Sequence, residues 1–175
     1  LPGHGAKIDE TALREALAGI DRSFEHETPA DVLSLTNLTE CGMAYETGEI
    51  AHFAALAKEA GLVVHLDGAR LANALASTGA SPADMSWRAG VDVLTMGLTK
   101  TGAIGCEMII VFGALRQRFP ALLASAKRSG HMPPKMRFLA AQALALLEDG
   151  LWLELAGSAN QSARQLADAL CAQSG

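Results

Sequence analysis

Two short stretches of this sequence place chemically reactive side chains directly after apolar runs. Residues 63–70 read VVHLDGAR, so Asp67 and Arg70 follow a run of aliphatic residues. Residues 91–102 read VDVLTMGLTKTG, and a single lysine, Lys100, stands near their end between two glycines. Apolar runs of this length are typical of strands buried on both faces of a parallel sheet. Because ligands bind beyond the carboxyl ends of such strands, we expect Asp67, Arg70 and Lys100 to share one site.

An acid, an arginine and a lysine at adjacent strand ends suit an anionic cofactor that has a ring nitrogen and a carbonyl group. Pyridoxal phosphate fits that description. Lys100 would form a Schiff base with its aldehyde, once desolvation and nearby positive charge remove the proton of the amine. Asp67 would keep the pyridine nitrogen protonated, and Arg70 would bind a substrate carboxylate through two parallel hydrogen bonds.

Each of these three side chains also has a purely structural interpretation. Asp67 and Arg70 could form an ion pair at the start of a helix. Lys100 could be a solvated loop lysine, as most lysines are. His65, inside its apolar run, is predicted to be a hydrogen-bonded core histidine rather than a catalyst.

Strands and helices alternate around these stretches. The sequence predicts strands over 32–36, 62–66, 91–96 and 107–112, and helices over 9–19, 47–61, 71–77, 81–90, 114–126, 133–149 and 151–172. The strand–helix–strand unit from 33 to 66 favours parallel pairing, while the short gap before Glu107 favours an antiparallel last strand. We therefore expect an α/β fold, with a mostly parallel sheet flanked by helices.

A polar loop, residues 37–46, follows the first predicted strand. Asn37, Thr39 and Glu40 could face a ligand there. An equally good interpretation is that they satisfy backbone groups of the turn. A second loop is predicted over 127–131, where Lys127 and Arg128 are basic.

The composition excludes several classes of protein. The 175 residues carry a net charge of −5 without a basic stripe, so nucleic acid is not an expected partner. No apolar run reaches the ~20 residues that span a bilayer, and no signal peptide opens the sequence. The three distant cysteines form no CxxC pair, which fits a reducing cytoplasm without disulfides, and each is expected to be a small buried residue.

Three stretches resemble one known family. Residues 65–74, HLDGARLANA, resemble the signature of the threonine aldolases, which are pyridoxal-phosphate enzymes of the aspartate-aminotransferase fold beside the β-eliminating lyases. Residues 97–102, GLTKTG, resemble the loop that carries the Schiff-base lysine of that family, and residues 135–142, KMRFLAAQ, are similar to a further family stretch. Within the family the resemblance is strongest to the low-specificity L-threonine aldolase branch.

The resemblance implies a role for each candidate residue. Lys100 would hold the cofactor, Asp67 would pair with its ring nitrogen, and Arg70 would bind the substrate carboxylate or the phenolic oxygen of the cofactor. Arg128, or Lys127 beside it, would lie near the phosphate, with a neighbouring subunit as a possible source. The implied reaction cleaves L-threonine or L-allo-threonine, through the Schiff base at Lys100, to glycine and acetaldehyde. The implied protein is a cytoplasmic homo-oligomer, a dimer or a dimer-based tetramer, that acts on a small β-hydroxy-α-amino acid.

Two features depart from the family pattern. The loop over 37–42 lacks the histidine that many relatives have there, which leaves Glu40, a water or a group outside this chain as the proton acceptor. The phosphate-binding glycine–threonine turn, the ring-stacking histidine and the small C-terminal domain are not found. We therefore expect residues 1–150 to be part of the pyridoxal-phosphate-binding large domain of fold type I. Residues 151–175 would form a helix that leads towards the small domain.

Other functions stay open. A β-eliminating lyase, a racemase or an aminotransferase on the same fold would use Lys100 and Asp67 in the same way, and its products would distinguish it. A non-catalytic relative would bind the cofactor without turnover. A nucleotide-binding module is disfavoured because residues 97–102 lack the Gly-Lys-Ser/Thr ending, and without an HExxH motif no metal site is expected.

Overall fold

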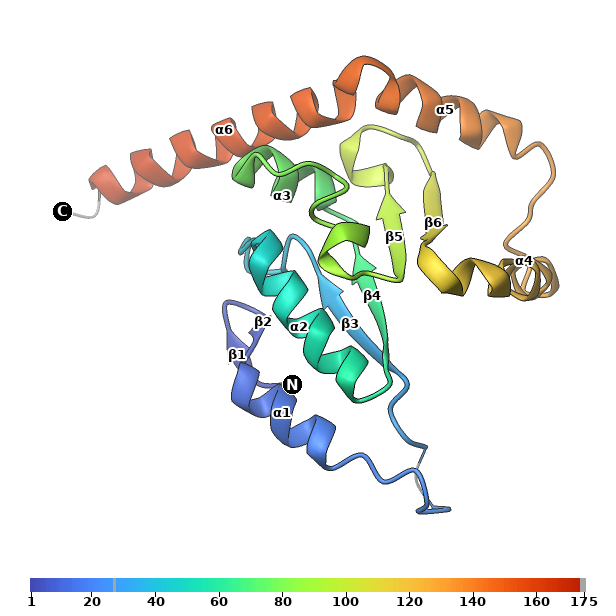
Figure 1. Cartoon of the computed structure of the whole chain (residues 1–175). Coiled ribbons are helices and arrows are strands. Elements are labelled where there is room, and N and C mark those ends of the chain that lie inside the picture. The colour runs from blue at the N-terminus through green and yellow to red at the C-terminus, as the bar shows by residue number, and fades with distance from the viewer. Residues whose placement is uncertain (27, 174–175) are drawn as a thin grey trace.

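The computed structural model, which describes residues 1–26 and 28–173, is built on a four-stranded sheet with the order β3-β4-β5-β6 (Figure 1). The strands are β3 (Val32–Thr36), β4 (Val63–Asp67), β5 (Val93–Gly97) and β6 (Glu107–Val111). The first three are parallel, and β6 runs antiparallel to β5. The predicted α/β class, the parallel pair and the antiparallel last strand are therefore confirmed.

Helices connect the strands and follow them. They are α1 (Glu10–Ala18), α2 (Thr47–Glu59), α3 (Leu71–Thr78), α4 (Phe119–Arg128), α5 (Arg137–Leu147) and α6 (Leu151–Gln173). The described residues also form 3-10 turns: η1 (Trp87–Ala89), η2 (Thr99–Thr101), η3 (Gly113–Arg118) and η4 (Glu148–Gly150). No helix among the described residues has the length and apolarity needed to cross a membrane.

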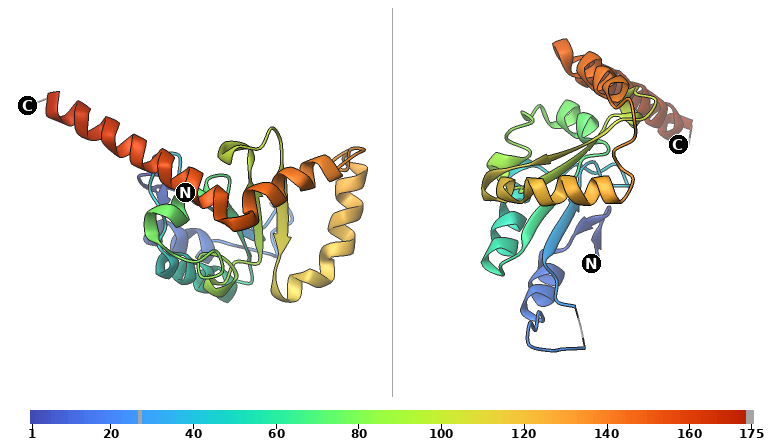
Figure 2. Two further views of the ribbon diagram at one scale, coloured as in Figure 1. Left: turned by 90° about the horizontal axis from the view of Figure 1, so that it is seen from above. Right: turned by 90° about the vertical axis from the view of Figure 1, so that its right-hand side faces the viewer.

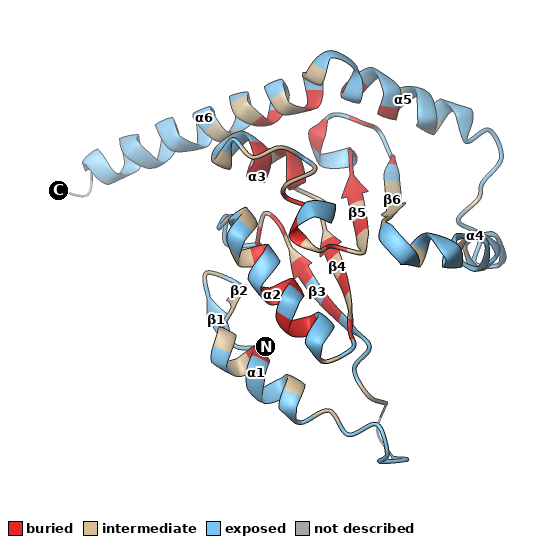
Figure 3. Ribbon diagram, viewed as in Figure 1, coloured by how far each residue is buried: buried red, intermediate tan, exposed pale blue. Residues whose placement is uncertain are grey.

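The hydrophobic core lies on one face of the sheet, where α2 and α3 pack (Figure 3). Val64 and Leu66 of β4 are both 0% exposed on this face. Register pairs them with Leu33 and Leu35 of β3. These alternating side chains point towards α2 because successive residues of a strand face opposite sides of the sheet.

On the opposite face of the sheet most β4 and β5 positions are only half-buried and the outer strands are largely exposed, so the prediction that the strands are buried on both faces was wrong. Val32 is 52% exposed and Ile109 is 50% exposed on this face. Its β3 and β4 positions include Ser34, His65 and Asp67. Polar residues at every second position mark a face that is not part of the apolar core. We name this surface the open face.

Several predicted helix boundaries were wrong. Residues 82–86 form turns followed by η1 instead of the predicted helix. Ser81 Oγ still accepts a hydrogen bond from the Asp84 amide at 3.1 Å, as the N-cap residue of a helix would. The segment is too short for a regular helix, and i→i+3 bonds such as that from the Ser86 amide to Ala83 tighten it. The helix predicted from Pro133 begins only at Arg137, because Lys135 has a φ of 63°.

Two other predictions needed correction, and one element was not predicted. Lys127 and Arg128 form the last turn of α4 rather than a loop. The element that was not predicted is a short hairpin, in which β1 (Gly3–His4) pairs with β2 (Lys7–Ile8). Cys106 is buried as predicted, but Cys41 and Cys171 are exposed.

The long helix α6 packs across α3 (Figures 1 and 2). The Asn73 amide donates to Asn160 Oδ1 at 2.9 Å, and the Asn160 amide donates back to the Asn73 carbonyl at 3.0 Å. Trp152 and Ala156 are its buried residues. Residues 161–173 of the same helix are exposed, so α6 is anchored by its first half.

Candidate functional site

The carboxyl ends of the three parallel strands and the start of β6 meet at one edge of the sheet. Register places Thr36 beside Asp67, Asp67 beside Thr95, and Gly97 beside Glu107. The predicted residues Asp67, Arg70 and Lys100 therefore emerge from adjacent strands at the same edge, as in other open α/β sheets. We name this region the carboxyl edge.

Asp67 is the last residue of β4, and a tight turn holds its carboxylate. Its Oδ1 accepts a hydrogen bond from the Ala69 amide at 2.9 Å. The Gly68 amide donates to the Thr95 carbonyl at 2.7 Å, and a Cβ at Gly68 would lie only 2.9 Å from that carbonyl oxygen. Glycine is therefore needed where the turn leaves the sheet. Among the described residues no donor contacts Oδ2, so one oxygen of this half-buried carboxylate is available to a ligand.

Arg70 stands at the N-cap of α3, three residues beyond Asp67. It is half-buried, and within the described part of the chain its guanidinium forms no ion pair. The structural alternative, an Asp67–Arg70 ion pair at the head of the helix, is not formed. The guanidinium thus keeps its full hydrogen-bonding capacity for an anionic ligand.

Lys100 lies in the turn η2, directly after β5. The turn is fixed by backbone bonds from the Thr101 amide to the Leu98 carbonyl at 3.0 Å and from the Leu98 amide to the Cys106 carbonyl at 3.0 Å. The lysine side chain is exposed and has no ion-pair partner in the segments that the structure describes. A rigid turn at the carboxyl edge therefore carries a free amine.

Glu107 is a site residue that sequence reasoning missed. Its Oε1 accepts a hydrogen bond from Thr99 Oγ1 at 2.9 Å, and Thr99 immediately precedes Lys100. A Cβ added at Gly97 would lie 2.7 Å from Glu107 Oε2 and 3.2 Å from Ala69 Cα. The carboxylate therefore lies over a glycine that leaves room for it. The sequence signal that could have indicated it is an acidic residue at the first position of the strand that follows the lysine loop.

Replacing Gly97 with alanine is expected to displace Glu107, because the new methyl group would overlap its carboxylate. Glu107 is exposed and its carboxylate can move aside, so the free energy of unfolding should fall by only about 1 kcal/mol, partly through the 3.2 Å approach to Ala69 Cα. Urea unfolding of Gly97→Ala would measure it, with Gly105→Ala as the control, because a Cβ at Gly105 meets nothing within 4 Å. Adding Glu107→Ala should restore part of the loss. Equal stability of the two alanine variants would contradict this account.

Asn37 and Thr39 hold the loop after β3 and do not face a ligand. Asn37 is 0% exposed, its Oδ1 accepts from the Tyr45 amide at 3.1 Å, and its Nδ2 donates to the Tyr45 carbonyl at 3.1 Å. Thr39 Oγ1 donates to the Gly5 carbonyl at 2.9 Å. Their turn interpretation is therefore confirmed, whereas Glu40 is exposed.

Replacing Asn37 with alanine is expected to destabilise the protein without changing the chemistry of the carboxyl edge. The Tyr45 amide and carbonyl would lose their partners while buried, which costs roughly 1–3 kcal/mol per unsatisfied group. The free energy of unfolding in urea measures the effect. Glu40→Ala, an exposed change in the same loop, should alter it by less than about 0.5 kcal/mol. A loss as large in Glu40→Ala would refute the assignment.

Arg128 is not brought to the carboxyl edge. It ends α4, which packs against η3 and lies level with the far end of β6 (Figure 1). Both Arg128 and Lys127 are exposed. Within one chain, neither side chain joins Asp67 and Lys100.

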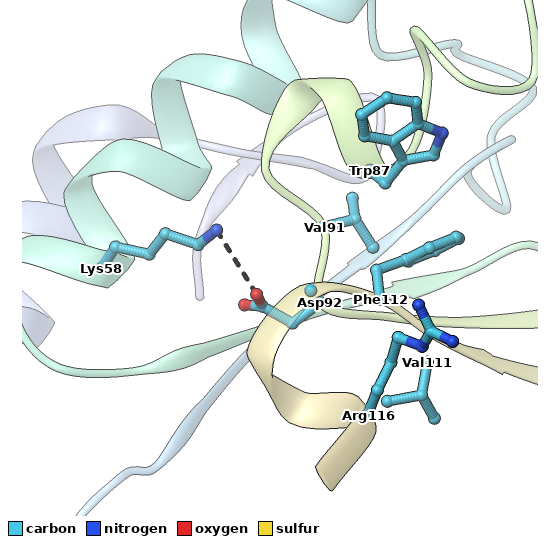
Figure 4. Close-up of a pocket in the computed structure, with 8 residues that line it drawn as sticks. Lys58, Trp87, Val91, Asp92, Val111, Phe112 and Arg116 are labelled. Atoms are coloured by element: carbon cyan, nitrogen blue, oxygen red, sulfur yellow. Dashed lines mark ion pairs between the residues drawn. The ribbon is translucent and has the colours of Figure 1, made fainter. Parts of the chain in front are cut away.

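A second concave region lies at the opposite edge of the sheet (Figure 4). It encloses ≈ 350 Å³ and contains the ion pair between Lys58 and Asp92, with 3.4 Å between Nζ and Oδ1. The other oxygen of Asp92 accepts from the Val64 amide at 2.9 Å. Asp92 therefore ties the beginning of β5 to β4, and its role is structural.

Comparison with known proteins identifies the class to which this fold and edge belong. The chain belongs to the beta-eliminating lyase family, whose model matches residues 1–174. Its likeness to a solved threonine aldolase of Leishmania major has a TM-score of 0.82 at 28% identity, covering 98% of this chain and 49% of that one. The predicted fold class, that of the pyridoxal-phosphate-dependent lyases, is thus confirmed.

Two curated relatives are more similar in sequence. The low specificity L-threonine aldolase of Pseudomonas sp. (strain NCIMB 10558) is 39% identical over 162 residues, and that of Pseudomonas aeruginosa (strain PAO1) is 40% identical over 163 residues. Each alignment covers 93% of this chain and 46% of the relative. The chain therefore spans about half the length of the curated relatives it matches.

Proposed function

We propose that this chain contributes the reactive lysine and the ring-nitrogen carboxylate of a pyridoxal-phosphate-dependent threonine aldolase. The proposed reaction cleaves L-threonine or L-allo-threonine to glycine and acetaldehyde. One observation carries it: Asp67, Arg70 and Lys100 emerge together at the carboxyl edge, and among the described residues none of the three forms an ion pair. The names of the relatives support the same reaction.

The residues present fit this cofactor. Asp67 offers a fixed carboxylate with one oxygen open, which suits a protonated ring nitrogen. Lys100 offers an amine on a rigid turn, and Arg70 offers an unpaired guanidinium. Because Gly68 has no side chain, the turn after Asp67 lies close to the Thr95 carbonyl. Because Gly97 has none, the Glu107 carboxylate lies directly over the backbone there. When bound, pyridoxal phosphate supplies a ring that accepts the electron pair released as the Cα–Cβ bond of the substrate breaks.

Each of the site residues named above has a defined part in this proposal. Lys100 would form the covalent link through its Nζ, and Asp67 would hold the ring nitrogen through its carboxylate. Arg70 orients the substrate by binding its carboxylate. Glu107 holds Thr99 and so fixes the turn that carries the lysine. The group that takes the proton of the substrate hydroxyl is Glu40, a water or a group outside this chain.

The remaining expectations belong to the same proposal. Residues 1–150 form part of the large cofactor-binding domain, and residues 151–175 lead towards a small domain. The protein acts as a cytoplasmic homo-oligomer, a dimer or a tetramer. Arg128 or Lys127 of a neighbouring subunit would lie near the phosphate, and their location in α4, which the carboxyl edge of the same chain does not include, supports this.

Borohydride trapping tests the site directly. The protein is incubated with pyridoxal phosphate and reduced, and peptide mass mapping locates the adduct. We expect it on Lys100. A folded protein that gives no adduct on Lys100 would overturn the proposal.

A product assay then tests the reaction. Because the matching family model describes beta-eliminating lyases, β-elimination is the second candidate. Glycine and acetaldehyde from L-threonine indicate aldol cleavage, whereas pyruvate and ammonia from L-serine indicate elimination. A trapped adduct without either set of products would indicate a racemase, an aminotransferase or a non-catalytic relative.

A further inference from the structure

A row of hydrogen-bonded side chains crosses three strands on the open face, just below the carboxyl edge. Ser34 Oγ of β3 lies 2.7 Å from His65 Nδ1, and His65 Nε2 lies 3.0 Å from Thr95 Oγ1 of β5. The imidazole of His65 therefore links β4 to both of its neighbours. No part of the function proposed above uses this row.

Thr95 connects the row to Asp67. It is the register partner of Asp67 across β4 and β5. Its carbonyl accepts the Gly68 amide at 2.7 Å, so it also holds the turn that fixes the carboxylate. His65 and Asp67 lie two residues apart on the same face of β4 and share Thr95 as a neighbour. The imidazole is thus linked to the Asp67 turn through Thr95, whose hydroxyl bonds to the ring and whose carbonyl holds the Gly68 amide.

The protonation state of His65 decides how the row is bonded. A neutral imidazole donates from one ring nitrogen and accepts at the other, which matches two hydroxyl groups that can do either. A protonated imidazole would donate to both hydroxyls and would place a positive charge beside Asp67. That charge would compete with a protonated ring nitrogen for the same carboxylate.

The surroundings of the imidazole favour the neutral form. Burial lowers the pKa of His65 below its ordinary value, and the negative charge of Asp67 opposes this shift. Neither β3 nor β5 carries a titratable side chain. From η3, Arg118 lines a cavity of ≈ 280 Å³ together with Thr95, and it adds a positive charge on this side. Glu107, beside Gly97, is the nearest acid on β6.

We propose that His65 is a positioning residue for Asp67: a neutral imidazole, tied to Ser34 and Thr95, that holds the strand whose carbonyl fixes the Asp67 turn and leaves the charge of Asp67 to the cofactor's ring nitrogen. The inference rests on the proposed function, because it concerns the same carboxylate. It assigns His65 a part beyond that of a core histidine.

The first test needs no cofactor. Nitrogen-15 NMR of the ring of His65, assigned by its loss in His65→Gln, reports the protonation of each ring nitrogen. At pH 7 we expect one protonated and one bare nitrogen. Thr95→Val, which removes only the hydroxyl, should shift the Nε2 resonance, whereas Thr95→Ser should not. Two protonated ring nitrogens at pH 7, or identical spectra for both Thr95 variants, would overturn the proposal.

The second test uses the protein loaded with pyridoxal phosphate. Thr95→Val should lower kcat by roughly 10–100-fold with little change in KM, as loss of an orienting partner does. Thr95→Ser should stay within about threefold of wild type, because it keeps the hydroxyl. The visible absorption of the bound cofactor should change in Thr95→Val, and His52→Leu on α2 controls for loss of a histidine elsewhere. Circular dichroism confirms that each variant is folded.

The outcomes separate the two proposals. A wild type that takes up no cofactor refutes the proposed function, and the role of His65 towards Asp67 falls with it. A wild type that binds cofactor and turns over substrate, with Thr95→Val unchanged in kcat and absorption, refutes the role of His65 alone.

Discussion

Replacing Lys100 with alanine is expected to abolish the borohydride-reducible adduct and to lower kcat by roughly 10³-fold or more. The reason is chemical: no other side chain of the described carboxyl edge has a primary amine. Lys100→Arg should fail as well, because a guanidinium keeps the charge but does not form the covalent link. Peptide mapping after reduction and steady-state kinetics of acetaldehyde release measure both effects.

Lys58→Ala is the matched control for this experiment. Lys58 is paired with Asp92 at the opposite edge of the sheet, so its loss should leave the adduct on Lys100 in place (Figure 4). The exposed ion pair should contribute about 0–1 kcal/mol to stability. An adduct that persists in Lys100→Ala, or that disappears in Lys58→Ala, would show that the reactive lysine has been misassigned.

The second large effect is expected at Asp67. Asp67→Asn keeps an oxygen that can accept from the Ala69 amide but removes the negative charge. Since that charge is proposed to keep the ring nitrogen protonated, kcat should fall by roughly 10²–10⁴-fold. Cofactor uptake at Lys100 should persist, because the lysine and its turn are unchanged. Kinetics and the absorption spectrum of the bound cofactor provide the measurements.

Two further variants separate charge from structure. Asp67→Ala removes both the charge and the bond to the Ala69 amide, and it should lose stability that Asp67→Asn keeps. Asp92→Asn, at the amino end of β5, removes a carboxylate that bonds to the Val64 amide but lies at the other edge. A kcat for Asp67→Asn that equals that of Asp92→Asn would rule out the proposed role of the Asp67 charge.

Much of the architecture could be predicted from the sequence because its signals are local. The apolar run before Asp67 predicted β4 to within one residue, and Asp9 capped α1 as expected through the Ala12 amide at 3.1 Å. Gly19 and Gly79 are the C-caps of α1 and α3. The carboxyl edge followed from one general rule about parallel sheets rather than from any single residue.

The sequence analysis missed the open face because an apolar β-branched residue, Val63, hid the alternation of polar and apolar residues along β4. Val63 precedes His65 and Asp67 on one face, so the run seemed continuous although its polar members share a side. The hairpin of β1 and β2 was missed because a Gly5-Ala6 turn, with both φ values near 60°, lacks the usual Asn-Gly signal. Glu107 could not be assigned because its contacts with Thr99 and Gly97 depend on the antiparallel register of β6.

The register of β4 decides whether the proposed site can form. Asp67 faces the open side only while the Asn37 amide donates to its carbonyl at 2.9 Å and the Gly68 amide donates to Thr95. A slip of one residue would turn every side chain of the strand to the other face and bury Asp67 against α2. Two backbone bonds that lie outside the chemistry are therefore as necessary to the proposed site as the carboxylate itself.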